Sequence, residues 1–139
     1  MVQREVAERL CADSKKSDYG AITASINYYG TVSRLFDVAP ENFLPAPKVT
    51  STVVRIELYN ELKYKVESEK MLFDTIAGAF SQRRKTLLNS LSSSLGGYTK
   101  EEIARAIESS GFDLQIRGER LSIADFCRLS DELLSIKKR

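Results

Sequence analysis

The chain has 139 residues, of which 42% are hydrophobic and 29% charged, and its net charge is only +2. This length suits one domain, or one domain plus part of another, and can bury a core without disulfides or metals. No apolar run reaches the length of a membrane span, the first residues carry no apolar signal segment, and histidine is absent. We therefore expect a cytoplasmic protein with no membrane contact, and the composition excludes histidine-based nucleophiles and histidine-ligated metal sites.

The two cysteines, Cys11 and Cys127, lie far apart and belong to no pattern of further metal ligands. One long-range disulfide would form only in an oxidising compartment. We expect two buried, reduced thiols that pack as small hydrophobic side chains.

The first 66 residues indicate mixed α/β structure. Apolar residues spaced four apart predict a short helix over 21–29, with Gly30 as its C-terminal stop. Residues 31–38 are rich in β-formers and end before a proline, and residues 49–58 form the strongest predicted strand. In that strand Val54, Ile56 and Leu58 share one face, whereas Arg55 and Glu57 share the other.

Residues 1–10 show neither a helix cap nor a strand start, and two strands rarely make a stable sheet. We therefore expect the chain to begin inside a larger α/β domain. All three prolines fall within residues 40–47, which predicts a stiff, extended loop between the two strands. Such a loop suits the display of one projecting side chain, and Phe43 is the candidate.

After Tyr64 the pattern becomes helical, and about four helices are expected. Apolar residues at helical spacing indicate the first two helices, and a Ser-Gly segment at 92–97 separates them from the last two. Each of the last two helices begins at a sequence that resembles a capping box. The residues that carry this pattern are Leu72, Phe73, Ile76, Phe80, Leu87, Leu88, Leu91, Leu95, Thr99 with Glu102, Ile103, Ile107, Gly111, Ser122 with Asp125, Phe126, Leu129, Leu133 and Ile136.

Three consecutive cations, Arg83, Arg84 and Lys85, interrupt this pattern and are called the basic triplet below. A helix continuing through them would place Arg84 within the apolar stripe. Either Arg84 is buried against an acid, or the chain breaks near Ser81 and Gln82. The triplet is either a solvated charge run or a phosphate-binding cluster, and composition alone does not separate these two interpretations.

Five segments in order resemble the ribosomal RNA adenine dimethyltransferase family, and most closely its small-subunit branch. They are Met1-Val-Gln-Arg-Glu-Val-Ala-Glu-Arg-Leu10, Asp18-Tyr-Gly20, Asn42-Phe-Leu-Pro-Ala-Pro-Lys-Val-Thr-Ser-Thr-Val-Val-Arg55, Phe80-Ser-Gln-Arg-Arg-Lys-Thr-Leu-Leu-Asn-Ser-Leu91 and Arg117-Gly-Glu-Arg-Leu-Ser122. The resemblance implies a Rossmann-like domain that binds S-adenosylmethionine, followed by a helical domain that binds ribosomal RNA. Such enzymes dimethylate two adjacent adenines near the 3′ end of small-subunit RNA.

The fold class implied for this chain is an α/β remnant followed by a small all-α domain. Residues 1–66 would be the last strands and a helix of the Rossmann-like methyltransferase domain. Residues 67–139 would be the helical rRNA-binding domain.

The resemblance also implies roles for individual residues. Phe43 matches the aromatic side chain that packs against the flipped target adenine, with a core residue that anchors the loop as the alternative. The basic triplet matches the cluster that binds the 30S-type ribosomal subunit. Arg117 matches a further RNA-contacting arginine, with a plain surface cation or an ion pair with Glu119 as the alternative. Lys48 is a candidate phosphate contact, with a solvated lysine as the alternative.

The chain departs from the family in its cofactor motifs. It contains no Gly-x-Gly and no Asn-Leu-Pro-Tyr tetrapeptide. We therefore expect a C-terminal half that binds no cofactor by itself, does not methylate alone, and self-associates through an uncovered sheet. The alternatives are a stand-alone RNA- or ribosome-binding module and a helical interaction domain without an RNA role.

Overall fold

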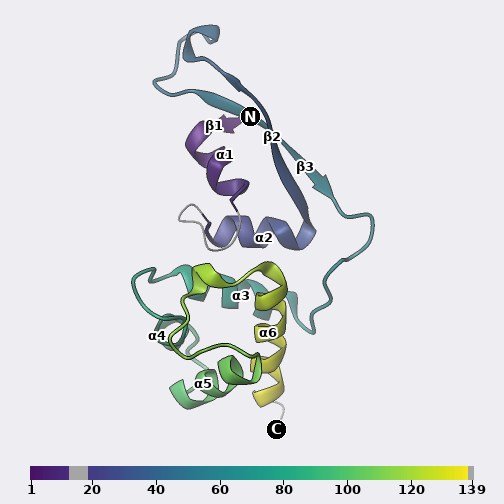
Figure 1. Cartoon of the computed structure of the whole chain (residues 1–139), viewed down its shortest axis with the longest axis vertical. Helices are drawn as coiled ribbons and strands as arrows, with labels where there is room; N and C mark the ends of the chain where they lie inside the picture. The colour runs from purple at the N-terminus through teal and green to yellow at the C-terminus, as the bar shows by residue number, and fades with distance from the viewer. Residues whose placement is uncertain (13–18, 138–139) are drawn as a thin grey trace. The chain divides into compact units, whose positions relative to one another are not determined.

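The structure of the chain, a computed structural model, describes residues 1–12 and 19–137 (Figure 1). Asp18, part of one segment that carries the family resemblance, lies outside these ranges. The chain divides into two compact units, Met1–Lys63 and Tyr64–Arg139, called the first and second units below. No helix within the described ranges has the length and apolar character needed to cross a bilayer.

The first unit is a three-stranded antiparallel sheet with two helices. The strand order is β1-β3-β2, so β3 lies in the middle. Figure 1 shows the long β2–β3 ribbon with α1 beside it and α2 across the end where β2 begins. The elements are β1 (Val2–Gln3), α1 (Arg4–Leu10), α2 (Ala21–Tyr29), β2 (Gly30–Val38), the short 3-10 helix η1 (Pro40–Asn42) and β3 (Ser51–Leu58).

The sequence predicted three of these elements. The helix over 21–29 is confirmed at both ends, and the two strands are confirmed to within two residues. Residues 1–10 show no helix cap or strand start in the sequence, yet β1 and α1 lie there. Contacts with distant residues stabilise these two elements: β1 pairs with β3, and Arg4 N donates to Thr50 O at 2.9 Å. Local signals are weak there, because α1 begins without a side-chain cap.

The pairing register confirms which side chains share a face of the sheet. Val32 pairs with Ile56 and Gly30 with Leu58, while Arg55 and Glu57 form a 2.9 Å ion pair on the opposite face. The predicted apolar face is only partly covered. Ile56 is 47% exposed and Leu58 70% exposed, whereas the core beneath α1 and α2 contains Ala7, Leu10, Ala24, Tyr28 and Thr52.

The second unit contains the four predicted helices. Serine and threonine side chains begin them: Ser68, Thr86 and Thr99 each accept a hydrogen bond from the backbone of the first turn, and Thr99 with Glu102 forms the predicted capping box. The elements are α3 (Glu69–Phe80), α4 (Leu87–Ser94), α5 (Lys100–Ser109), the 3-10 helix η2 (Gly118–Arg120) and α6 (Ile123–Lys137).

Apolar side chains from all four helices form one core. Helix α3 packs on α4 and α6, and α5 packs on α4 and α6. The fully buried members are large aliphatic and aromatic side chains, so their removal from water supplies the main stabilisation of this unit. They include Leu72, Ile76, Leu87, Leu91, Ile103, Ile107, Leu121, Phe126, Leu129 and Leu133.

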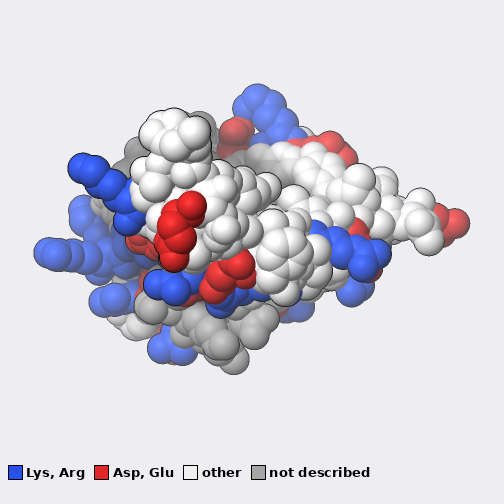
Figure 2. All heavy atoms as spheres, turned by 90° about the horizontal axis from the view of Figure 1, so that it is seen from above, with Lys and Arg blue, Asp and Glu red and all other residues white. Residues whose placement is uncertain are grey.

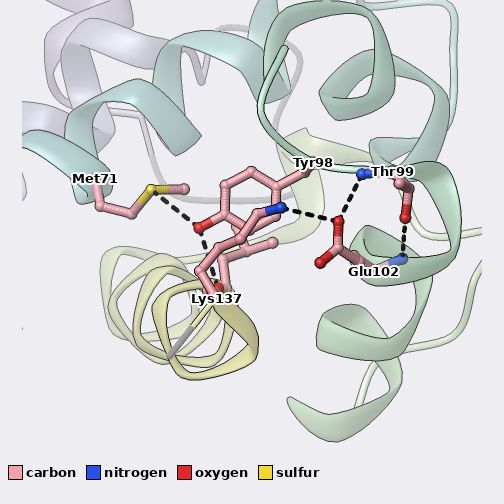
Figure 3. Close-up of polar contacts among 6 residues, drawn as sticks. Met71, Tyr98, Thr99, Glu102 and Lys137 are labelled. Atoms are coloured by element: carbon pink, nitrogen blue, oxygen red, sulfur yellow. Dashed lines mark hydrogen bonds and ion pairs between the residues drawn. The ribbon is translucent and has the colours of Figure 1, made fainter. Parts of the chain in front are cut away.

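A polar cluster around Tyr98 joins three helices at one end of this core (Figure 3). The Tyr98 hydroxyl donates to Leu133 O of α6 at 3.1 Å and lies 3.9 Å from the sulfur of Met71 in α3. Lys137 Nζ lies 4.8 Å from the centre of the Tyr98 ring and 3.1 Å from Glu102 Oε1. Burial, and then the charge of Glu102, raise the pKa of the Tyr98 hydroxyl above its ordinary value.

The two cysteines are free thiols in different surroundings. Cys127 is buried, as expected, and burial raises the pKa of its thiol to about 11. The expectation for Cys11 is wrong in part: it is half-buried, because it follows the end of α1 at the margin of the core.

Candidate nucleic-acid interface

The basic triplet lies in a turn between α3 and α4. Helix α3 ends at Phe80, Lys85 N donates to Gln82 O at 3.0 Å, and Thr86 caps the start of α4. The helix therefore breaks at Ser81, which was the second of the two predicted alternatives. All three cations are exposed, so Arg84 is not buried in the core.

Two serine hydroxyls hold the helix ends on either side of this turn. Ser81 Oγ donates to Gly78 O at 2.7 Å, and Ser90 Oγ, from α4, donates to the same carbonyl at 2.6 Å. The Ser81 N–H also donates to Gly78 O at 3.2 Å, so this carbonyl at the end of α3 accepts from one backbone donor and two side-chain donors. These bonds fix the start of the turn.

A second basic segment, which contains Arg117, packs directly beside the basic triplet. Leu87 N, at the start of α4, donates to Ile116 O at 2.8 Å. Gly118 is buried against α3, where an added Cβ would lie 2.9 Å from Ala79 O. Arg117 lies between these two attachment points and is exposed. The structure thus brings the predicted Arg117 to the basic triplet, although 32 residues separate it from Lys85 in the sequence.

Arg120 is a further exposed cation in this loop, within η2, which the sequence interpretation missed. The available signal was the Arg-Gly-Glu-Arg spacing. A 3-10 turn closed by Arg120 N donating to Arg117 O at 3.0 Å keeps both arginines near the surface. Below, the interface surface means Arg83, Arg84, Lys85, Arg117 and Arg120.

Most of the positive charges on this surface are not paired with carboxylates in the described residues. Within the described residues, Arg84, Lys85, Arg117 and Arg120 form no ion pair, so the alternative of a pair between Arg117 and Glu119 is not present. Arg83 lies over the Phe80 ring, with 5.9 Å between its guanidinium carbon and the ring centre. Exposed guanidinium groups of this kind can each bind a phosphate through two hydrogen bonds.

The first unit carries the other two predicted site residues, in the loop between β2 and β3. Residues 40–42 form η1, so the expectation of an extended chain is wrong there: proline suits the first position of such a turn, and Asn42 N donates to Ala39 O at 3.1 Å. Phe43 is half-buried rather than projecting. Among the large hydrophobic side chains of this loop, Leu44 is the most exposed, at 101%.

Lys48 is exposed and lines an open pocket of about 370 Å³. Arg4 lies in the same wall, but so do Glu5 and Glu8, so the pocket is of mixed charge. The face in Figure 2 shows Lys and Arg side chains mainly at its margins and carboxylates within a broad uncharged area. Among the predicted site residues, the basic triplet and Arg117 of the second unit lie together, whereas Lys48 of the first unit shares its pocket with two carboxylates.

Comparisons with known proteins agree with the motifs. The model of the ribosomal RNA adenine dimethylase family matches residues 1–134, and the chain belongs to that family. Ribosomal RNA small subunit methyltransferase A of Alkaliphilus metalliredigens is 41% identical over 133 residues, which cover 96% of this chain and 46% of the relative. The protein of the same name in Clostridium botulinum is 40% identical over 136 residues, which cover 98% and 49%.

Solved structures share the fold. A dimethyladenosine transferase from Plasmodium falciparum has a TM-score of 0.76 at 22% identity, over 98% of this chain and 55% of that one. The 23S rRNA methyltransferase ErmE has a TM-score of 0.57 at 19% identity, over 94% and 52%. The chain spans about half the length of the relatives it matches.

Proposed function

We propose that this chain is the C-terminal, RNA-binding portion of an S-adenosylmethionine-dependent rRNA adenine dimethyltransferase that acts in the cytoplasm during ribosome biogenesis. Its substrate would be two adjacent adenines near the 3′ end of small-subunit rRNA. Membership of the family supports this proposal. The observation that carries it is the interface surface, where two basic segments distant in sequence lie together and expose their charges.

The chain's own residues bind and orient the RNA in this proposal. Cations of the interface surface neutralise about three to four backbone phosphates and release counterions, which gives affinity without reading sequence. Phe43 forms one wall of the pocket for the flipped adenine, where stacking on an aromatic ring contributes about 1–3 kcal/mol per base. Lys48, exposed five residues further on, would contact a phosphate beside that base.

The described residues do not fit S-adenosylmethionine. Among them, β2 leads into Pro40 and β3 into Tyr59 and Asn60, so neither long strand ends in a glycine-rich turn. We therefore assign the cofactor to the remainder of a longer enzyme and derive no chemical step through it. The exposed Ile56 and Leu58 favour contact with that remainder, or self-association of this chain when it is alone.

The salt dependence of binding to purified small-subunit rRNA tests the RNA-binding role. Contact with three to four phosphates predicts a slope of log K against log salt of about −3. The double variant R83A/R84A should flatten the slope by about 1.5. The matched control K100A/R105A removes the same charge from exposed positions of α5 and should bind like the wild type.

A wild-type chain without salt-dependent binding, or equal losses in the two double variants, would overturn this role. Methyl transfer is measured separately. The chain alone should transfer no radiolabelled methyl group from S-adenosylmethionine to small subunits, and transfer would overturn the assignment of the cofactor to the missing portion.

A further inference from the structure

Ser90 differs from the other serines of α4 in the direction of its hydrogen bond. Ser92, Ser93 and Ser94 each donate to the carbonyl four residues earlier in their own helix, at 2.7, 3.2 and 3.2 Å. The Ser90 hydroxyl instead crosses to α3 and donates to Gly78 O at 2.6 Å. It also lies 3.4 Å from Ala79 O and 3.2 Å from Ser81 Oγ. Ser90 is completely buried, so water does not compete for these bonds.

The carbonyls that Ser90 contacts belong to the last turn of α3, and Phe80, Ser81 and Gln82 link this turn to the basic triplet. Gly78 allows α4 to come this close, because a Cβ there would collide with the Ser94 hydroxyl and lie 3.1 Å from Leu91 Cδ2. The direction in which the chain leaves α3, and hence the position of the triplet, depends on this contact between α3 and α4.

Gly118 attaches the second basic segment to the same point of α3. A Cβ at Gly118 would lie 2.9 Å from Ala79 O and 3.0 Å from Ala79 Cβ, which is too close for an alanine without movement of the backbone. Ala79 O is therefore approached by Ser90 from α4 and by Gly118 from the loop that carries Arg117 and Arg120.

We propose that Ser90 and Gly118 are positioning residues, which fix the distance between the basic triplet and Arg117 so that one RNA backbone contacts both segments at once. This inference rests on the proposed RNA-binding function. Neither residue touches RNA in this arrangement: Ser90 is buried beneath the surface, and Gly118 has no side chain.

A double-mutant cycle on the whole chain tests the proposal. The affinity for purified small-subunit rRNA is measured at about 0.1 M salt. Losing one phosphate contact lowers affinity by about fivefold under these conditions, so Arg117→Ala should cost about fivefold in the wild-type background. In the Ser90→Ala background the two segments no longer bind together, and Arg117→Ala should cost less than about twofold.

Ser93→Ala is the matched control, since it removes an exposed hydroxyl that bonds only within α4; there the cost should remain about fivefold. Gly118→Ala disturbs the same contact from the other side. Gly118→Ala should reduce the effect of Arg117→Ala on affinity as Ser90→Ala does. If far-UV circular dichroism shows that Ser90→Ala is unfolded, Gly118→Ala takes its place in the cycle.

An equal cost of Arg117→Ala in all backgrounds would overturn the positioning role while leaving RNA binding intact. A wild-type chain with no salt-dependent binding would overturn the proposed function, and this inference with it. A reduced effect in the Ser90→Ala and Gly118→Ala backgrounds, but not in the Ser93→Ala background, supports the proposal.

Discussion

Replacing Gly30 with alanine should loosen the pairing of β2 with β3. Gly30 is the first residue of β2 and is paired with Leu58. A Cβ at this position would collide with the carbonyl oxygen of Glu57 and lie 2.9 Å from its carbonyl carbon and 3.0 Å from Leu58 Cα. All three are backbone atoms of the central strand, so no side-chain rotation relieves the collision and a strand must move.

Overpacking of this kind typically costs about 1–3 kcal/mol in the free energy of unfolding. For a local opening of the hairpin, that cost lowers protection against hydrogen exchange by about 5- to 150-fold. Gly97→Ala is the matched control, because nothing lies within 4 Å of a Cβ there. It should be neutral or stabilise the second unit by about 0.4–1 kcal/mol, since alanine restricts the unfolded chain.

Hydrogen exchange followed by mass spectrometry of peptides from β2 and β3 measures the effect directly. The amide of Tyr59 is a useful reporter, because it donates to Tyr29 O at 2.9 Å next to the substituted site. Unchanged protection in Gly30→Ala, or a loss as large in Gly97→Ala, would refute the reasoning from backbone contact.

Two further predictions concern titratable groups. The Thr99 N–H, and then Lys137, hold the pKa of Glu102 below its ordinary 4.5, so the stability contributed by its charge is present above that pH and is lost as the pH falls through the lowered pKa. Thermal unfolding between pH 7 and 3 should show this loss in the wild type and not in Glu102→Gln. Burial raises the pKa of the Cys127 thiol to about 11, so Cys127 should react with iodoacetamide at pH 8 much more slowly than the half-buried Cys11. Peptide mass spectrometry measures both reactions. Faster reaction at Cys127 would contradict the burial described.

Local patterns predicted the helical unit well because its signals act over a few residues. The Thr99 and Glu102 capping box begins a helix where expected, and the cationic break near Ser81 ends one. The capping box acts locally because its two side chains bond to backbone N–H groups of the first turn, and the break acts locally because a continued helix would place Arg84 in the apolar stripe. The helix at 21–29 begins without a side-chain cap and was predicted from its apolar spacing and from Gly30 at its end.

Elements that depend on distant partners were missed. Strand β1 is two residues long and exists because β3 offers it hydrogen bonds, and α1 follows it without a cap. The full exposure of Leu44 and the half-burial of Phe43 were likewise not predicted from the local pattern. Periodicity contains no information about such partners, since they lie about 50 residues away for β1.

The amino-acid sequence by itself determined the family, the four helices of the second unit and the identity of the basic residues, since caps, apolar spacing and segment order are all local. Only the tertiary structure decided that Arg117 and Arg120 lie beside the basic triplet. That proximity depends on a hydroxyl crossing from α4 to α3 and on a glycine lying against Ala79. Contacts of this kind form only after the helices have packed, because each joins atoms of separate elements.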